Sequence, residues 1–542
     1  MLAERSQDEK KFNRISILTV ILLAVAYCSH LTVLEIDPRL DEIRRGLVSL
    51  EMLLSGNWLV PTINGEPYLN KPPLYNWLLA LSYKTFGVNE FALRMPVIAA
   101  IFFFGWIIYR YSKQHIGHKA AVLVSLLFIT NGRILIYDSL IGLIDILYSS
   151  LVFLSFMVVY NYGKKEKWFH AFMLSYLIVV AGFLMKGLPS LVYQAILLPV
   201  FFIGEGKWKV LFHKAHFAAI LVMVLLLGTY YYFYFNEVNL SANEFVTRLI
   251  TESTDRTVVN ASTQKTILYI LGFPLIYIYN FAPWTLFLLL IIRNNWINRL
   301  TENHFVRFNA ILFFFCSLIY WLSPNSIARY MFMIVPLSFN VAAWYYTDER
   351  NENSLVKKWI GHVLAGLLMV LGLGCIVLPF ISFTNHLPLV EVKAVFLLLT
   401  LGICGYASFK QPKLSLSFII LGFVFVRIGF NWFVVEQRGK FSIEQRLEAE
   451  KVMEIAGDRP IYLEKGADHG NPDGLSFNIA LKQQRILPLT DSIIPNAVYI
   501  TDSVTMINKP NKVLYRWASE FQPNHYLVEY TQGESQDAHQ HQ

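Results

Sequence analysis

Asp41 and the two arginines that follow it, Arg44 and Arg45, have the residue types and the spacing for chemistry on an anionic substrate. A helix that begins near Asp37-Pro38 and ends near Ser55-Gly56 would place both guanidinium groups on the side of the carboxylate, since residues three and four positions apart share a helix face. The carboxylate could then act as a base beside an anion clamp. The same spacing fits an ordinary helix ion pair, and the charges alone leave both interpretations open.

Further ionisable residues stand at the ends of apolar segments, where a charge is costly and usually serves a function. They are Asp138, Lys186 and Arg329, the last followed by Tyr330. Lys186 and Arg329 could equally extend to the membrane surface, because long basic side chains reach the interface from a helix end. Asp138 is too short to do so. Asp145 lies deeper in the next apolar segment, and the simpler expectation is that it packs against a hydroxyl group or Tyr148.

Many cations and a few carboxylates beside a bilayer suit a lipid whose phosphate lies at headgroup level. Arginine and lysine would hold the phosphate, a carboxylate would take a proton from an incoming hydroxyl, and the phosphate would depart. Neither the GxGxxG nor the Walker pattern occurs, so we expect neither a soluble nucleotide donor nor ATP as an energy source. The HExxH pattern is absent and His30, His386 and His469 are scattered, so we expect no metal held by the protein.

The composition is that of a polytopic membrane protein. Of the 542 residues, 55% are hydrophobic and 15% are charged, and the mean hydropathy is +0.44. The four cysteines lie in apolar runs without a CxxC pattern, so we expect neither a disulfide framework nor a thiolate metal site. Most of the net charge of +8 lies in loops that we expect in the cytoplasm, so it indicates topology rather than nucleic-acid binding.

Thirteen apolar runs are long enough to span a membrane, which takes about 17 to 25 residues. They lie near residues 15–34, 91–110, 119–136, 140–161, 168–185, 187–203, 214–235, 268–292, 305–323, 329–346, 358–382, 390–408 and 414–435. A further candidate, residues 74–86, is short and follows Pro72-Pro73, so we expect an interfacial or re-entrant helix there. The first run follows a basic start without a small-residue cleavage site, which predicts an uncleaved span rather than a signal peptide.

The positions of lysine and arginine predict the orientation. With the N-terminus in the cytoplasm, each of the longer inside loops carries two or three of these residues, and the short outside loops carry almost none. The transmembrane domain would comprise residues 1–435. Its loops 35–90 and 236–267 would lie outside the cell membrane, as would residues 441–542, which follow this domain. We expect 441–542 to be a small α/β domain, with a helical pattern from Ile443 to Ile455. Its strand-like runs lie at 461–463, 497–500 and 526–528.

Several motifs resemble a family of bacterial GT-C glycosyltransferases, the lipid A aminoarabinose transferases and the related protein O-mannosyltransferases. The motifs are DEIRRG at 41–46, SGNWLVPTINGEPYLNKPPLYNWLLALSYKTFG at 55–87, NEFALRMP at 89–96, GRILIYDS at 132–139, LMKGLP at 184–189, ESTDR at 252–256, Ala282-Pro283-Trp284 and SPNSIARYMFMIVPL at 323–337. The resemblance covers roughly residues 15–345, and the motif in the first loop is its specific part.

This resemblance implies an integral membrane enzyme with the GT-C fold in a bacterial inner membrane. Members of the family take a sugar from a polyprenyl phosphate, here undecaprenyl phosphate, on the outer side and pass it with inversion to a hydroxyl of a lipid or a protein. The donor is already charged and tethered to lipid, so no soluble cofactor is expected. We also expect a monomer.

The resemblance also assigns roles to residues. Asp41 resembles the catalytic acidic residue of the first loop, with Glu42 as its motif partner, and Asp138 resembles a second outer acidic residue. The groups that would bind the carrier phosphate and the sugar are Arg44, Arg45, Lys71, Lys186, Arg256, Arg329 and Tyr330. Asn70 stands where many relatives have an acidic residue, so the sequence does not indicate the divalent metal that relatives bind there.

Two other functions compete with this interpretation. A transporter or flippase of polyprenyl lipids or glycolipids would use the same cations for binding only. It predicts paired broken helices in two matching halves of the chain, and the sequence has no such symmetry. A polymerase or ligase of surface polysaccharide would share the chemistry without needing the first-loop motif.

Overall fold

The computed structural model describes residues 2–32, 41–238, 263–292, 299–437 and 440–530, apart from 325, 352–353, 470–471, 508–510 and 519–523. Between 239 and 262 it describes only Ser241, Asn243, Glu244 and Thr247. The chain divides into two compact units, Met1–Leu31 with Arg94–Gln437 and Thr32–Leu93 with Arg438–Gln542. The loop that contains Asp41 therefore belongs to the same unit as the C-terminal α/β region.

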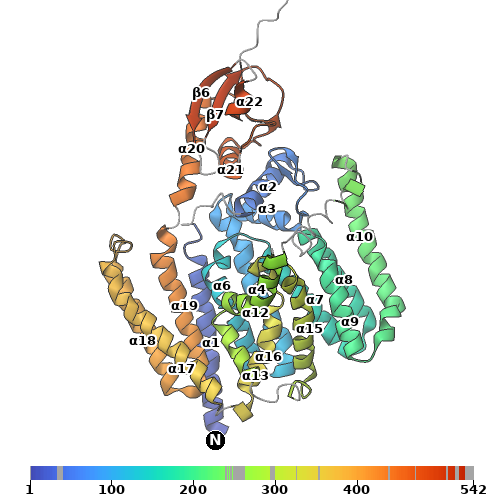
Figure 1. Cartoon of the computed structure of the whole chain (residues 1–542), viewed down its shortest axis with the longest axis vertical. Coiled ribbons are helices and arrows are strands. Elements are labelled where there is room, and N and C mark those ends of the chain that lie inside the picture. Colours follow the sequence, from blue (N-terminus) through green and yellow to red (C-terminus); the bar gives the residue numbers. More distant parts are fainter. Residues whose placement is uncertain are drawn as a thin grey trace, which may run out of the picture. The chain divides into compact units, whose positions relative to one another are not determined.

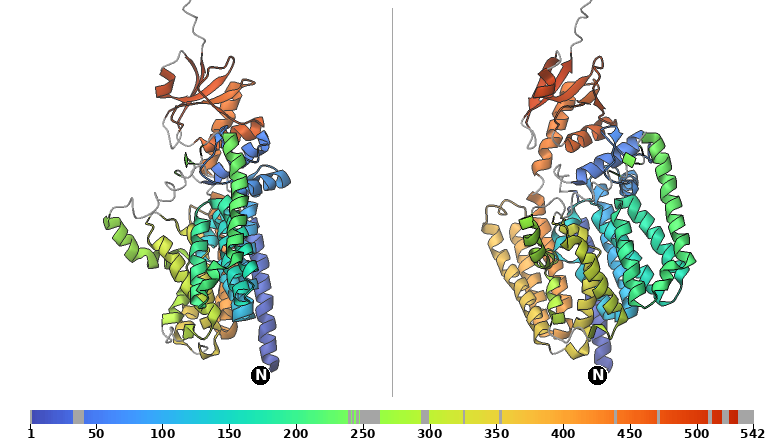
Figure 2. Two further views of the ribbon diagram at one scale, coloured as in Figure 1. Left: turned by 90° about the vertical axis from the view of Figure 1, so that its right-hand side faces the viewer. Right: turned by 45° about the vertical axis from the view of Figure 1, so that its right-hand side comes forward.

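The first unit is a bundle of apolar helices (Figure 1). The longer helices are α1 (Leu2–Cys28), α4 (Glu90–Ile116), α7 (Asp145–Lys164), α8 (Trp168–Lys186), α10 (Lys214–Val238), α15 (His304–Trp321), α17 (Leu355–Gly374), α18 (Val390–Lys410) and α19 (Ser415–Phe433). Each is long and apolar enough to cross a membrane, which makes nine such helices in the part of the chain that the structure describes. Helices α17, α18 and α19 pack together, and α8 and α10 pack together elsewhere in the bundle (Figure 2).

Two further predicted spans are broken. Residues 119–136 correspond to α5 (His118–Ile129), α6 (Gly132–Ile136) and the 3-10 turn η1 (Asp138–Leu140), with a bend of 45°. Residues 268–292 correspond to α12 (Thr263–Asn280), the 3-10 turn η4 (Trp284–Leu288) and α13 (Leu289–Ile292), with a bend of 115°. Counting each bent pair as one span gives up to eleven candidates among the described residues.

The two breaks lie against each other. The backbone N–H of Gly132 donates to the carbonyl of Ala282 at 2.8 Å, and the indole N–H of the fully buried Trp284 donates to the carbonyl of Thr130 at 2.9 Å. Asn131 caps α6, because its side chain accepts the N–H of Ile134. Backbone groups that the breaks release are thus satisfied inside the protein, which irregular structure at membrane depth requires.

The remaining two predicted spans are shorter than the sequence suggests. Residues 187–203 form α9 (Pro189–Gly204), and residues 329–346 form the 3-10 turn η5 (Ala328–Met331) followed by α16 (Val335–Thr347). Eleven of the 13 residues of α16 are buried. Hydropathy alone does not distinguish such a helix, which is apolar because it is surrounded by other helices, from one that crosses the bilayer.

The second unit contains the predicted helices of the first loop. Helix α2 (Asp41–Ser55) ends where predicted, and Gly56 follows with a positive φ of 71°; its predicted start at Asp37-Pro38 lies outside the described residues. Helix α3 (Leu74–Phe86) has the predicted bounds and does not count as a candidate span. Between them lies a hairpin of β1 (Thr62–Ile63) and β2 (Glu66–Pro67).

The C-terminal part of this unit is a five-stranded mixed sheet with three helices. The strands are β3 (Ile461–Glu464), β4 (Leu489–Thr490), β5 (Val498–Asp502), β6 (Asn511–Trp517) and β7 (His525–Tyr530), and the helices are α20 (Lys440–Ala456), α21 (Asp473–Gln483) and α22 (Ser503–Ile507). The strand order is β4-β3-β5-β7-β6. Strand β3 pairs in parallel with β4 and β5, whereas β7 pairs antiparallel with β5 and β6. The sequence predicted β3, β5, β7 and α20.

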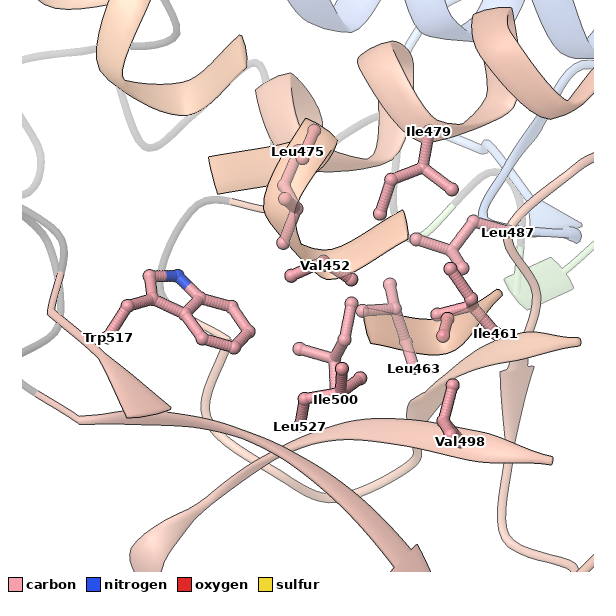
Figure 3. Packing of buried hydrophobic residues seen from close by; sticks show 12 residues of the cluster. Val452, Ile461, Leu463, Leu475, Ile479, Leu487, Val498, Ile500, Trp517 and Leu527 are labelled. Atoms are coloured by element: carbon pink, nitrogen blue, oxygen red, sulfur yellow. The ribbon is translucent and has the colours of Figure 1, made fainter. Parts of the chain in front are cut away.

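Alternate residues of the strands build the core of this sheet (Figure 3). Leu463 and Ile500 point to the face that α20 and α21 cover, where they meet Val452 and Ile479. The neighbouring Tyr499 packs on the opposite face, in a second cluster. The alternation follows from the period of two in a strand, and it explains why the short apolar runs of the sequence predicted strands.

Candidate active site

Asp145 lies at the centre of an ionic cluster in the helical unit. It is the first residue of α7, and Lys186 is the last residue of α8. The Lys186 Nζ lies 2.5 Å from one carboxylate oxygen of Asp145, and the Nε of Arg329 in η5 lies 3.2 Å from the other. The exposed fractions of these side chains are 6% for Asp145, 12% for Lys186 and 16% for Arg329. One buried carboxylate therefore pairs with two cations, and the cluster keeps a net positive charge.

Tyrosine rings complete this cluster. The Lys186 ammonium lies 3.9 Å from the centroid of the Tyr330 ring and 5.1 Å from that of Tyr148, as in cation–π contacts. The Tyr320 hydroxyl donates to the Tyr330 carbonyl at 2.5 Å, which anchors the η5 turn. The structure thus brings together three predicted site residues, Lys186, Arg329 and Tyr330.

The expectation for Asp145 is wrong, because its carboxylate pairs with cations rather than only packing against a hydroxyl or Tyr148. Both cations point to this carboxylate. The predicted acidic residue, Asp138, lies in η1 and forms its ion pair with Arg133, at 2.8 Å from the guanidinium Nε. Arg133 also donates to the Asn280 side chain at 3.1 Å.

A buried arginine that the sequence analysis did not single out supports the segment around Asp138. Arg427 of α19 is fully buried and donates to the Leu135 carbonyl and to the Ser139 hydroxyl. Its guanidinium carbon lies 5.0 Å from the Tyr27 ring centroid. The rule that ionisable residues in apolar spans are functional would have drawn attention to it, since it is an arginine within the apolar run 414–435.

In the second unit, Arg44 lies between two carboxylates. Its Nε donates to Asp473 of α21 at 2.9 Å, and its Nη1 lies 4.0 Å from Asp41. Half of the Asp41 side chain is exposed, whereas Asp473 is buried. Burial raises the pKa of Asp473, and Arg44 opposes that shift. The predicted pair of Asp41 and Arg44 exists, but the shorter contact of Arg44 is with a residue that the sequence did not indicate.

The other predicted residues of the first loop differ in exposure. Arg45 is buried; its Nη2 donates to the Tyr68 hydroxyl at 2.9 Å, and its guanidinium lies 5.2 Å from that ring centroid. Glu42 is buried as well, whereas Lys71 is half-buried in the segment before α3. Arg45 therefore faces the hairpin side of α2, and Asp41 and Arg44 are the more exposed pair.

Glu51 of α2 organises the hairpin that precedes Lys71. Its carboxylate accepts the Thr62 hydroxyl at 2.7 Å and the backbone N–H groups of Asn64 and Gly65 at 2.6 and 3.2 Å. Asn64 and Gly65 both have positive φ, at 53° and 78°, as the Asn-Gly hairpin turn requires. The Asn-Gly pair was visible in the sequence, but the buried carboxylate that holds it was not predicted.

Arg256 lies outside the described residues, as does most of the 236–267 loop. Among the residues that are described, no group of three or more histidine, cysteine, aspartate or glutamate side chains is arranged to hold a metal ion.

Comparison with known proteins identifies relatives of the chain. Residues 70–232 match the family model described as dolichyl-phosphate-mannose-protein mannosyltransferase. The chain is 26% identical over 417 residues to the undecaprenyl phosphate-alpha-4-amino-4-deoxy-L-arabinose arabinosyl transferase 1 of Proteus mirabilis, covering 72% of this chain and 71% of that protein. It is 31% identical to an uncharacterized protein of Aquifex aeolicus over 34% of this chain and 36% of that one.

The fold matches a solved structure over nearly its full length. ArnT from Cupriavidus metallidurans, in a crystal structure bound to undecaprenyl phosphate, superposes with a TM-score of 0.63 at 18% sequence identity. The match covers 94% of this chain and 97% of that one. The structure of the same ArnT in the apo state also gives a TM-score of 0.63.

These likenesses agree with one another. The family model and the Proteus relative are both named as glycosyltransferases, which does not favour the transporter alternative. The structural match establishes the architecture that the first-loop motif implied. The chain is therefore an ArnT-like membrane glycosyltransferase with the GT-C fold.

Proposed function

We propose that this protein transfers a sugar from undecaprenyl phosphate, or a similar polyprenyl phosphate, to a hydroxyl group of a lipid or a protein. The observation that carries the proposal is the Asp145 cluster, in which Lys186 and Arg329 share one carboxylate and retain a net positive charge. Such a cluster attracts an anionic phosphate. The Proteus relative is named for an undecaprenyl phosphate-linked sugar, and the Cupriavidus ArnT was crystallised with undecaprenyl phosphate, which supports this donor.

In the proposed reaction, the acceptor oxygen attacks the anomeric carbon of the sugar. The bond between that carbon and the phosphate oxygen breaks, so the configuration inverts and the polyprenyl phosphate leaves with the electron pair. Asp41 takes the proton of the acceptor hydroxyl or orients that hydroxyl. Asp41 suits this role because half of its side chain is exposed, whereas its motif partner Glu42 is buried. A role for Asp138 as a second acidic residue belongs to the same proposal.

Cations would stabilise the charge that develops on the departing phosphate. From the first loop we propose Arg44 and Lys71 for this role. From the helical bundle we propose Lys186 and Arg329. The Tyr330 ring packs against the ammonium group of Lys186. Arg45 is buried against Tyr68, so its contribution would be to position the loop. Arg256 remains a predicted phosphate ligand.

We further propose that the protein lies in a bacterial inner membrane as a monomer, with its N-terminus in the cytoplasm and residues 441–542 in the periplasm. The positive-inside distribution of the loops supports this orientation. The reaction needs no soluble cofactor, since the donor carries its own leaving group. Activity that survives dialysis against a metal chelator would support a metal-independent reaction, and loss that divalent cations restore would contradict it.

The proposed function is tested by transfer of label in membranes. A strain that lacks the gene is supplied with the wild-type protein, Asp41→Asn or Glu66→Gln, and its membranes receive a radiolabelled lipid extract of the native cells. Glu66 is the matched control, because it is a carboxylate of the same loop whose side chain is about as exposed as that of Asp41, and it pairs with Lys465 at 3.0 Å.

Wild type and Glu66→Gln should label an acceptor, and Asp41→Asn should lower the rate by at least about a hundredfold, in the range usual for loss of a general base. Chemical analysis of the labelled species then distinguishes a lipid acceptor from a protein. Equal labelling by Asp41→Asn at equal expression would contradict the role of Asp41. If wild-type membranes label nothing, the transfer reaction itself is contradicted, and flipping of the carrier becomes the function to measure.

A further inference from the structure

The contact between Arg44 and Asp473 joins parts of the chain that are 429 residues apart. Asp473 opens α21, and its carboxylate accepts the Nε–H of Arg44 at 2.9 Å. Only 4% of Asp473 is exposed, so its charge lies in a region of low dielectric. A buried carboxylate beside a guanidinium is a strong and directional partner. The C-terminal domain thus contributes a side chain directly to the first-loop motif within the second unit.

The packing around this pair leaves little space for movement. Helix α2 lies against α21 and α3 at Gly46, where an added Cβ would come within 3.0 Å of the Tyr83 hydroxyl and 3.4 Å of the Phe477 ring. Phe477 belongs to α21, one turn after Asp473. Helix α21 therefore packs closely against α2 beside the pair of Arg44 and Asp473.

A carboxylate on Nε restricts the guanidinium in a particular way. Arginine has a planar group with five N–H donors, and fixing the Nε–H fixes the direction of that plane. Asp41 lies 4.0 Å from Nη1, on the same guanidinium. The side chain of Arg44 is 35% exposed, so part of it remains accessible to a ligand while its Nε is held by a buried residue. Ordering Arg44 in advance removes part of the entropy cost of binding a phosphate.

We propose that Asp473 is a positioning residue for the donor, which acts through Arg44 by orienting its guanidinium toward the carrier phosphate. This inference rests on the proposed role of Arg44 in binding that phosphate. It gives the C-terminal domain a part in donor binding. An ion pair that served only to attach the domain would have no effect on the affinity for the carrier.

The test measures the affinity of the full-length protein for undecaprenyl phosphate, in nanodiscs of zwitterionic lipid. Arg44→Ala and Asp473→Ala should each weaken binding about tenfold, the loss expected for one hydrogen bond to a charged group. The double variant should bind no more weakly than Arg44→Ala alone, because Asp473 acts only through Arg44. Asp473→Asn keeps an acceptor oxygen for the Nε–H and should recover part of the affinity.

The chain offers a matched control in a second ion pair between the same two segments. The charged atoms of Lys465 beside β3 and of Glu66 of β2 lie 3.0 Å apart; Lys465 is exposed, and about half of the Glu66 side chain is exposed. Lys465→Ala removes an attachment between the C-terminal domain and the first-loop hairpin without touching Arg44, so its affinity for undecaprenyl phosphate should equal that of wild type. Melting temperatures of all variants verify that the second unit remains folded.

The outcomes separate the inference from the function on which it rests. If Arg44→Ala binds as tightly as wild type, the proposed role of Arg44 is contradicted, and the inference with it. If Arg44→Ala binds weakly while Asp473→Ala binds as wild type or more tightly, only the positioning role is overturned. Additive losses in the double variant, or an equal loss in Lys465→Ala, would also overturn it, since Asp473 would then act independently of Arg44 or through attachment of the domain.

Discussion

The ammonium of Lys186 lies 2.5 Å from the carboxylate of Asp145 and 3.9 Å from the ring of Tyr330, so one lysine joins the end of α8 to the start of α7 and to η5. Arg329 approaches the same carboxylate from η5. The three side chains are largely buried, and Asp145 is the only anion among them. A phosphate would compete with Asp145 for these cations.

Removal of the Asp145 charge should destabilise the bundle. Asp145→Asn leaves Lys186 and Arg329 without their carboxylate, and loss of one partner from a buried ion pair costs about 3–5 kcal/mol. Adding Lys186→Met should recover part of that loss, because one of the two cations that lost the Asp145 charge is removed. Thermal unfolding of the purified proteins in detergent measures both effects.

The control is Asp8→Asn, which breaks an exposed pair with Lys413 at 3.5 Å. Such surface pairs contribute at most about 1 kcal/mol, so this variant should unfold at nearly the wild-type temperature. A double variant that is no more stable than Asp145→Asn would show that the cost does not come from the loss of the Asp145 charge beside Lys186.

Gly132 at the break between α5 and α6 should not tolerate alanine. An added Cβ would lie 2.7 Å from the carbonyl oxygen of Ala282, which also accepts the N–H of Gly132. We expect Gly132→Ala to lower the melting temperature and to cost about 1–3 kcal/mol, as overpacking does. Gly228→Ala is the control, because nothing lies within 4 Å of its added Cβ. Equal melting temperatures for the two variants would mean that the breaks can separate freely.

Loss of the Glu51 carboxylate should open the hairpin locally. In Glu51→Ala, the N–H groups of Asn64 and Gly65 lose their acceptor, and each unsatisfied group costs about 1–3 kcal/mol where water does not replace it. Hydrogen exchange of residues 57–72 should accelerate while that of α3 changes less. Thr62→Val removes only the hydroxyl contact and should have a smaller effect. The role of Glu51 is refuted if exchange in this segment stays at the wild-type rate.

The sheet of the second unit should lose stability in acid because of His525. Burial lowers the pKa of this histidine from 6.5 to about 4, and the nearby His469 adds to the shift. The folded state therefore binds the proton more weakly than the unfolded state. The contribution is fully present above about pH 6.5 and is lost as the pH falls toward 4. A shift of this size corresponds to at most about 3 kcal/mol.

Hydrogen exchange of β5 and β7 at pH 7 and pH 5, corrected for the intrinsic exchange rate, measures this effect in the full-length protein. In His525→Phe the ring that stacks on Trp517 is kept, with centroids 5.3 Å apart in the wild type, but the titrating group is absent. This variant should lose less stability between the two pH values. An identical loss in both proteins would assign the acid sensitivity to other groups.

Elements with strong local signals could be predicted from the sequence. Helix α3 follows two prolines and ends just before Gly87, so its bounds and its length were both visible. Strands β3, β5 and β7 are apolar runs in the sequence, and they are the three interior strands of the sheet. The missed strands β4 and β6 have fewer buried residues, since β4 has only two residues and most of β6 is exposed or half-buried. A pattern of alternating burial is too weak there to predict a strand.

The site could be predicted in its residue types but not in its pairs. The sequence indicates Lys186, Arg329 and Tyr330, but no local pattern pairs Asp145 with a cation, because its partners lie 41 and 184 residues further along the chain. Asp473 was not singled out at all, since it stands 429 residues from Arg44 in a polar segment where an aspartate is unremarkable. Local spacing carries no information about pairs that only the tertiary fold brings together.

The position of β7 between β5 and β6 has a consequence for biosynthesis. This interior strand, residues 525–530, is among the last parts of the described chain to be translated, and α21 packs on α2, which is among the first. More than four hundred further residues must therefore be translated after the segment that contains Asp41 before its partner helix α21 exists. A premature stop before residue 525 would leave the sheet without the strand that joins β5 to β6, even though every predicted span had already been made.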